Sequence, residues 1–493
     1  MRILCRRALI VFLCELMVFL PASDVAVRLA ASPDLPPVTI PLRDYLQKPY
    51  IELFELAPQL RFNSAEIEGQ RKALEQGQKS CVSSFKDHAK QYASEIDAAQ
   101  KDLKKRTDSL SDPQRKESHC RIQNLELLKS EATVLSSHAI PTAYDNLAAK
   151  LDVIEKWPAL FVQTQQEIAS GAYLKRRWGD VKDIGFRDIA SGQEDDIKRG
   201  QEAIAEMKRI GMMPPSIEDK AIQDYVNTVA QQIARHSDLK VPLQVTLLQS
   251  KEINAFALPG GFLFIERGLL EAADDESELA GVVAHELAHV TARHSNKLMK
   301  RATIASIFYS AAQIAAVVLT GGVAGIGIYY ALQYGFYGLG MVLNLELLGV
   351  SREYEMEADQ LGVQYAWNSG YDPSGFIRFF DKIAMKQGYI NGASWFRTHP
   401  PFYQRMVDTQ REMLFLPPKP DLMMQTSAFE EMKKKLASVT VAAEKYDAKK
   451  PTLKLREEGC EAPKKLEYEP GQPIEKLCSL SAQPARAGAS RTP

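Results

Sequence analysis

Two histidines four residues apart, His285 and His289, limit the possible folds of this chain more than any other feature of its sequence. Just before them, Asp275 and Glu278 have the spacing of a helix-capping box. The apolar residues that follow predict a helix from Glu276 to about Lys297. Residues i and i+4 of a helix lie about 40° apart, so both imidazoles project from one face and can share a metal ion. Neutral imidazole is a good zinc ligand.

Glu286 lies about 100° round the same helix from His285. There its carboxylate can accept a proton from water whose pKa a zinc ion lowers to about 7. The alternative is a chance pair of surface histidines around a glutamate, and the independent evidence for a capped helix favours the metal site. His294 lies about 140° from His289, so it cannot reach the same metal unless the helix ends. We interpret His294 as a structural residue or as one that supports a ligand.

A third protein ligand is expected downstream, in the stretch SREYEMEADQLG. Glu355 and Asp359 are four residues apart on a predicted helix, so they share a face. One carboxylate can bind the metal while the other accepts a hydrogen bond from a ligating imidazole. The alternative is an ordinary acidic face of a solvated helix.

These motifs together resemble a known family. HELAHVTARH, with NAFALPGGFLF before it and EYEMEAD and THPP after it, is similar to the zinc metallopeptidases that include HtpX, the CAAX prenyl protease and, with the greatest similarity, the BepA-like periplasmic proteases. The resemblance covers about residues 185–412. It implies an α+β fold of zincin type with one Zn²⁺ per chain. It also implies that Glu355 is the third zinc ligand and that Asp359 supports the ligands.

The resemblance also suggests roles for other residues. The NAFALPGG segment matches the family's edge strand, along which a substrate peptide can pair through its backbone. We expect the strand that follows to hold the substrate, through Phe262, Leu263, Phe264 and Ile265. His399 matches a histidine that can reach the zinc, so we expect it to act as a latch on the metal, although a lone loop histidine is more often a surface residue. Arg405 is expected to anchor its segment to a carboxylate.

Two departures from the BepA-like pattern limit how far the family's substrates and partners can be expected for this chain. No C-terminal helical-repeat domain is found here, and an N-terminal helical region is added over residues 33–178. Within that region, residues 64–137 have helical apolar spacing with a break at Ser111-Asp112-Pro113, which predicts a helical hairpin or short coiled coil. A further helix over Pro141–Ser170 is expected to be interrupted at Pro158. The region is either a partner-binding stalk or a solvated spacer, and its partner is unknown.

The first residues predict export. A basic start and the short apolar run Ala8–Leu20 favour a signal peptide over residues 1–32, and an uncleaved anchor is the alternative. Removal of the signal leaves four cysteines, an even number with three possible pairings. We favour a Cys460–Cys478 disulfide because it closes a short loop, and free thiols are the alternative. The four cysteines are Cys81, Cys120, Cys460 and Cys478.

An uncharged insert over residues 302–345 separates the two ligand motifs. Because both motifs must meet at one zinc, the insert crosses a membrane either zero times or twice. We favour an apolar hairpin that faces a membrane surface or packs on itself, and a transmembrane pair is the alternative. Residues 413–493 are expected to form a partly flexible extension. The turn Pro259-Gly260-Gly261 predicts a β-hairpin, and alternation in VPLQVTLLQS predicts a strand before it.

Composition limits the class of partner. Lys+Arg 61 against Asp+Glu 62 gives a net charge of −1, which argues against a nucleic-acid partner. The apolar fraction of 45% is enough for a full core. Together with the motifs and the predicted signal peptide, this composition leads us to expect an exported, membrane-associated zinc endopeptidase that hydrolyses misfolded or stalled envelope proteins. The alternatives are an assembly factor or chaperone with latent proteolysis, and an integral membrane protease.

The expected location is thus the periplasm, in association with a membrane surface. The expected partners are unfolded or misfolded protein substrates.

Overall fold

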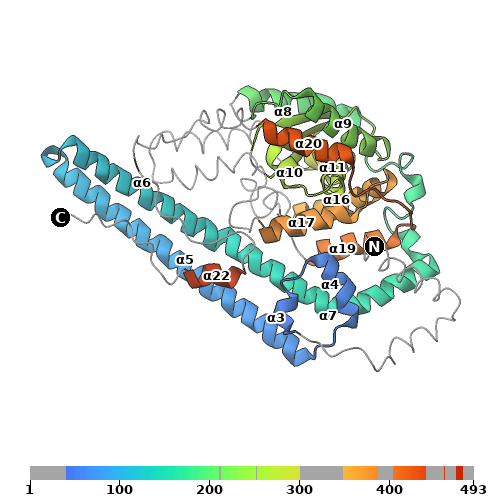
Figure 1. Ribbon diagram of the computed structural model, residues 1–493, viewed down its shortest axis with the longest axis horizontal. Coiled ribbons are helices and arrows are strands. Elements are labelled where there is room, and N and C mark those ends of the chain that lie inside the picture. Colours follow the sequence, from blue (N-terminus) through green and yellow to red (C-terminus); the bar gives the residue numbers. More distant parts are fainter. Residues whose placement is uncertain are drawn as a thin grey trace.

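The computed structural model describes residues 40–209, 213–250, 253–299, 348–386, 403–439, 460 and 473–480. A long helical hairpin and a compact body of helices round a small sheet can be distinguished in Figure 1. The prediction of a mostly helical α+β fold with an N-terminal helical region is confirmed. The expected signal peptide, the insert over residues 302–345 and most of the C-terminal extension lie outside the described residues.

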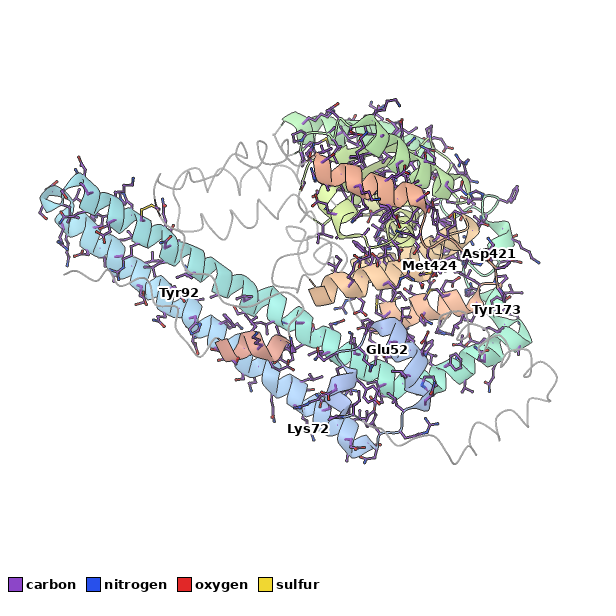
Figure 2. The ribbon with its side chains drawn as sticks, in the orientation of Figure 1. Glu52, Lys72, Tyr92, Tyr173, Asp421 and Met424 are labelled. Atoms are coloured by element: carbon purple, nitrogen blue, oxygen red, sulfur yellow. A yellow bond between two sulfur atoms is a disulfide. The ribbon has the colours of Figure 1, made fainter. Side chains whose placement is uncertain are left out.

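The hairpin consists of α5 (Ser64–Arg106) and α6 (Asp112–Val134), as the apolar spacing predicted. A capping box starts α5, because the Asn63 side chain accepts from the backbone N–H of Glu66 while the Glu66 carboxylate accepts from that of Asn63. Tyr92, labelled in Figure 2, lies midway along α5. Apolar residues of both helices are buried along the hairpin: Phe85, Tyr92 and Ile96 of α5 and Ile122, Leu125 and Leu128 of α6.

The chain continues from α6 through a π-helical stretch, Leu135–Ala139, into α7 (Ile140–Ser170). The expected interruption at Pro158 is wrong, because α7 runs through this residue. Proline removes one backbone hydrogen bond from a helix. Trp157 compensates, since its side chain is buried and its indole N–H donates to the Phe54 carbonyl at 3.0 Å. Tertiary packing outweighs the local cost.

Shorter elements join the hairpin to the body. Ahead of it lie α3 (Leu42–Tyr45), α4 (Tyr50–Leu56) and the 3₁₀ turn Ala57–Gln59. The link after α7 is rich in turns and leads to two further helices. These later elements are the 3₁₀ turns Ala172–Lys175, Val181–Asp183 and Gln193–Asp196, then α8 (Ile197–Arg209) and α9 (Lys220–Arg235).

The sheet has three strands, β1 (Gln244–Leu248), β2 (Ala255–Leu258) and β3 (Phe262–Glu266), in the order β1-β3-β2. β1 pairs with β3 in parallel, and β2 pairs with β3 antiparallel. The predicted strand and β-hairpin are confirmed. Gly260 and Gly261 form the tight turn with φ angles of 86° and 88°, a region that favours glycine.

The core of the body is α11 (Glu276–Thr291), which packs against α9, β2 and two later helices, α16 (Leu348–Asn368) and α17 (Ser374–Lys386). Gly362 on α16 lets this helix approach α11 closely, since a Cβ there would lie 3.0 Å from the His285 backbone. The remaining described helices are α10 (Arg267–Ala272), α12 (His294–Met299), α19 (Tyr403–Phe415), α20 (Ser427–Ser438) and α22 (Ile474–Leu480).

The helix that begins at Glu276 is shorter than expected. It ends at Thr291 rather than near Lys297, and α12 starts separately at His294. Arg293 between them has a φ angle of 56°, which reverses the chain and cannot continue an α-helix. Residues 291–294 include no Gly or Pro, so the sequence does not predict this break.

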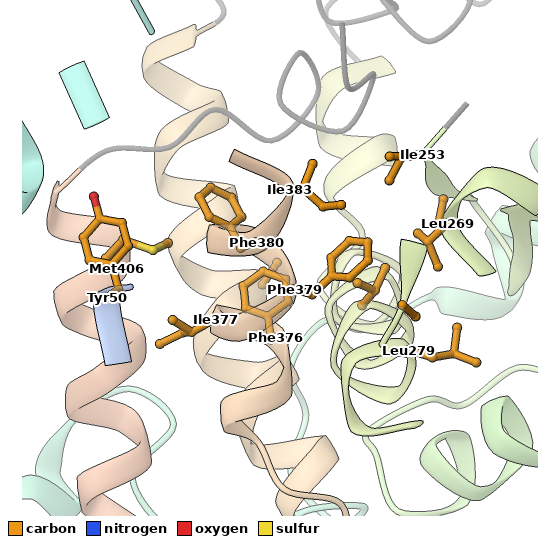
Figure 3. Close-up of a cluster of buried hydrophobic side chains, with 14 of the residues drawn as sticks. Tyr50, Ile253, Leu269, Leu279, Phe376, Ile377, Phe379, Phe380, Ile383 and Met406 are labelled. Atoms are coloured by element: carbon orange, nitrogen blue, oxygen red, sulfur yellow. The ribbon is translucent and has the colours of Figure 1, made fainter. Parts of the chain in front are cut away.

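The body and the N-terminal helices share one apolar core, centred on α17. Figure 3 shows Phe376, Phe379 and Phe380 of α17 between Met406 and Tyr50 on one side and Leu269 and Leu279 on the other. Tyr50 belongs to α4 and Met406 to α19. The N-terminal helical region therefore packs directly on helices of the body.

The favoured Cys460–Cys478 disulfide is wrong. The disulfides are Cys81–Cys478 and Cys120–Cys460, with Cα atoms 5.2 and 5.3 Å apart. Each late cysteine lies against a different helix of the hairpin, so closeness in sequence was a poor guide to closeness in space. The C-terminal segment is thereby tied to both helices of the hairpin.

Two further observations concern the C-terminal part and the membrane. α20, in the extension expected to be partly flexible, packs on the body through Phe429, Met432 and Leu436. Among the residues that the structure describes, none of the helices combines the length and the apolar character needed to span a bilayer.

Candidate metal centre

The centre is built on α11, which the sequence starts with a strong cap. The Asp275 side chain accepts from the backbone N–H of Glu278, and the Glu278 carboxylate accepts from that of Asp274. His285 and Glu286 are buried on this helix, whereas His289 is partly exposed. The open side of the centre is therefore the side of His289.

α16 brings Glu355 to the two histidines. The Nε2 atoms of His285 and His289 lie 3.0 Å apart, and the Glu355 carboxylate oxygens lie 3.5 and 3.4 Å from them. Ligands about 2.0–2.2 Å from a tetrahedral zinc lie about 3.3–3.6 Å from one another. These spacings and the two-nitrogen, one-oxygen donor set fit a zinc ion, and the three residues form the one metal-binding group found among the described residues.

The Nδ1 side of the His285 ring contacts a buried ion pair between Asp359 and Arg405. Its Nδ1 lies 2.9 Å from Asp359, whose carboxylate accepts two hydrogen bonds from Arg405 at the start of α19. Arg405 also lies 3.2 Å from Glu355. Phe376 stacks on the His285 ring at 5.0 Å. The structure thus brings Asp359 and Arg405 together with two of the three expected zinc ligands.

Opposing effects set the pKa of His285. Burial disfavours the charged ring, but the hydrogen bonds and charges of Asp359 and Glu355 outweigh it and raise the pKa to about 9. A metal must therefore displace a proton from this ring near neutral pH.

Glu286 lies between α11 and β2. Its carboxylate accepts a hydrogen bond from the backbone N–H of Ala257. Burial and the nearby Glu355 raise the pKa of Glu286 to about 8, although His285 and the Ala257 amide oppose the shift. A carboxylate with a raised pKa is suited to take up a proton.

His294 reaches the centre because α11 ends before it. Its Nδ1 lies 2.9 Å from Nδ1 of His289, and its Nε2 lies 3.3 Å from Glu357 on α16. Burial lowers the pKa of His294 despite the Glu357 carboxylate, so the ring is neutral at pH 7. Sequence reasoning missed Glu357, since the acidic face of α16 offers several carboxylates and only tertiary structure selects among them.

The expected substrate-binding residues need a correction. Phe262, Leu263, Phe264 and Ile265 lie on β3, which is buried and paired on both sides by β1 and β2. A central strand has no free edge for another chain. Among the described strands β2 is the edge strand beside α11, and Ala257 on it contacts Glu286. β2, the strand before the LPGG turn, therefore has an edge that β3 lacks.

His399 lies outside the described residues, so its expected latch role stays a prediction. Arg405, six residues later, is described and fully buried. The contacts of Arg405 place the start of α19 beside the centre.

Comparison with known proteins finds that this region is similar to a known peptidase family. Residues 217–412 match Peptidase family M48. The beta-barrel assembly-enhancing protease of Yersinia pestis is 29% identical over 227 residues, which are 44% of this chain and 44% of that protein. The putative beta-barrel assembly-enhancing protease of Vibrio cholerae serotype O1 is 30% identical over 246 residues, 48% of this chain and 49% of that protein.

A mitochondrial protein is also similar to this chain. The mitochondrial metalloendopeptidase OMA1 of Schizosaccharomyces pombe is 32% identical over 188 residues, 37% of this chain and 50% of that protein. The chain thus spans half or less of the length of these curated relatives. The expected resemblance to this metallopeptidase family is confirmed: residues 217–412 match the model of Peptidase family M48, and the matched relatives are named as proteases.

Proposed function

We propose that this chain is a zinc-dependent endopeptidase with a zincin-type catalytic centre. The observation that carries the proposal is the meeting of His285, His289 and Glu355 at zinc-like spacing, with Glu286 beside them. His285, His289 and Glu355 would hold one Zn²⁺. When bound, the ion supplies a Lewis acid that polarises the scissile carbonyl and makes water a better nucleophile.

The chain's own residues then supply positioning and proton transfer. Glu286 accepts the proton of the attacking water and passes it to the leaving amine. Asp359, held by Arg405, fixes the orientation of His285. β2 offers the edge on which an extended substrate segment can pair through its backbone. Such pairing requires a locally unfolded substrate, because a folded chain has no free strand to add.

The names of the relatives and the two disulfides support a proposal for the substrate class and for the cellular location of the chain. The matched beta-barrel assembly-enhancing proteases bear names that refer to the assembly of β-barrel proteins. Two disulfides suit an oxidising compartment. We infer that the chain is exported to the periplasm and cleaves misfolded or stalled envelope proteins there, in association with a membrane surface.

The test is cleavage of unfolded casein by the purified full chain and by Glu286→Gln. The wild type is expected to cleave, and added chelator to stop it. Glu286→Gln keeps the shape of the side chain but removes the base, so turnover should fall at least about a hundredfold while zinc is retained. Equal cleavage by both proteins would refute the proposed role of Glu286.

A second candidate function rests on the hairpin. In Figure 1, α5 and α6 extend well away from the body. This long surface favours an additional role as an assembly factor that holds client proteins. In that case Glu286→Gln would still bind an unfolded client, and shortening the hairpin would weaken that binding without lowering cleavage of a short peptide.

A further inference from the structure

The break between α11 and α12 has an uncommon geometry. Arg293 adopts a left-handed conformation, which residues other than glycine rarely adopt. Its guanidinium donates to the two carboxylate oxygens of Asp196 at 2.7 and 2.8 Å and to the Ser191 carbonyl, which holds the residue in place. On an uninterrupted helix, His294 would point about 140° away from His289. The break instead turns His294 back toward His289.

The His294 ring is buried, and both of its nitrogens lie close to polar groups. It is 1% exposed and stacks on Tyr354 at 4.4 Å with an interplanar angle of 10°. Its Nδ1 lies 2.9 Å from Nδ1 of His289. Its Nε2 lies 3.3 Å from one oxygen of Glu357, and the other oxygen lies 3.2 Å from Arg177.

The chemistry of these groups fixes the direction of the hydrogen bonds. An ionised carboxylate only accepts, so His294 donates through Nε2–H to Glu357. A neutral imidazole has one N–H, so Nδ1 of His294 must accept, and His289 donates to it through its own Nδ1–H. Nε2 of His289 is then left with its lone pair facing His285 and Glu355. This is the tautomer that a metal ligand needs.

We propose that His294 and Glu357 are a positioning pair that fixes the tautomer and ring orientation of His289 for metal binding. The proposal rests on the proposed zinc site. The pair does for His289 what Asp359 does for His285, with a histidine interposed between imidazole and carboxylate. Carboxylates of α16 then orient both histidines through their Nδ1 atoms, Asp359 directly for His285 and Glu357 through His294 for His289.

The test measures zinc affinity by competition with a chelator, together with the visible spectrum of the cobalt-substituted protein. His294→Phe keeps a ring against Tyr354 but removes both nitrogens, and should weaken zinc binding about ten- to a hundredfold with an altered cobalt spectrum. His294→Asn places an amide oxygen near the position of Nδ1 and should restore part of the affinity. His88→Phe, on the distant hairpin, is the matched control and should change neither readout.

Glu357→Gln provides an independent variant of nearly unchanged shape. Arg177 attracts the amide oxygen, which turns the NH₂ group toward His294 and reverses the hydrogen-bond direction. Zinc affinity should again fall about ten- to a hundredfold. If His294→Phe does not fold, as judged by circular dichroism, His294→Asn and Glu357→Gln decide the matter. Wild-type affinity and an unaltered cobalt spectrum in the folded variants would overturn the proposal. A wild-type chain that binds no zinc would instead overturn the proposed function.

Discussion

At the scale of single residues, the environment of each histidine decides how the centre responds to pH. Asp359 and Glu355 stabilise the charged form of His285 more than burial destabilises it. The same carboxylates would also attract a zinc ion, so a proton and a metal compete for one pocket. Zinc binding must therefore be linked to proton release.

We expect zinc affinity to fall as the pH falls below about 9, the pKa of His285. The folded chain holds the His285 proton more tightly than a free histidine does. The protonated, metal-free form is therefore favoured over the zinc-bound form as the pH decreases. The expected loss is about tenfold per pH unit from this group alone. Titration with a competing chelator between pH 6 and 8 measures it. Asp359→Asn should flatten the dependence, and an affinity independent of pH in the wild type would contradict the linkage.

At the scale of elements, α17 connects the N-terminal helices to the centre. Asp381 near its end lies 3.3 Å from Nζ of Lys150 on α7 and accepts from the backbone N–H of Tyr50 on α4. Lys150 and Asp381 are both buried, with side chains 1% and 4% exposed. The same helix presents Phe376 to His285. Three elements thus depend on one buried pair.

Lys150→Met should lower the free energy of unfolding by about 3–5 kcal/mol, because it leaves the Asp381 charge buried without its partner. Urea unfolding followed by circular dichroism measures this change. The double variant Lys150→Met/Asp381→Leu should recover much of the loss, since it removes both charges. Lys220→Met, in the exposed pair with Asp224, is the control and should cost less than about 1 kcal/mol. A similar small cost for Lys150→Met would show that the buried pair does not hold these helices together.

At the scale of the whole molecule, two disulfides join distant parts of the chain. Cys81–Cys478 and Cys120–Cys460 have sequence separations of 397 and 340 residues. Both tie the C-terminal segment to the hairpin. α7 packs on α5 of the hairpin and on α19 of the body, so the hairpin links the C-terminal segment to the body.

Peptide mapping of the non-reduced protein, made in an oxidising compartment, should find these two cross-links and no others among the four cysteines. The expected free thiol content of the denatured, non-reduced mature chain is therefore close to zero. A Cys460–Cys478 peptide, or four free thiols, would contradict this pairing.

The sequence was sufficient where a local pattern determines the structure. The capped helix of His285, the hairpin seam and the β2–β3 turn all follow from spacing and turn chemistry. The sequence was insufficient where contacts between residues far apart in the chain determine the local structure. The left-handed Arg293 depends on Asp196, the unbroken α7 depends on Trp157, and the disulfides depend on how the C-terminal segment returns to the hairpin. The central position of β3 could not be predicted either, because strand order is a property of the tertiary structure.

The central claim is that His285, His289 and Glu355 hold one zinc ion. X-ray absorption at the zinc edge of the purified full chain, with zinc content measured in parallel, tests it most directly. We predict about one zinc per chain, with at least two imidazole nitrogens and a carboxylate oxygen bound to it, and loss of that oxygen or of the metal in Glu355→Gln. A chain without zinc, or a zinc environment that is the same in wild type and Glu355→Gln, would contradict the account.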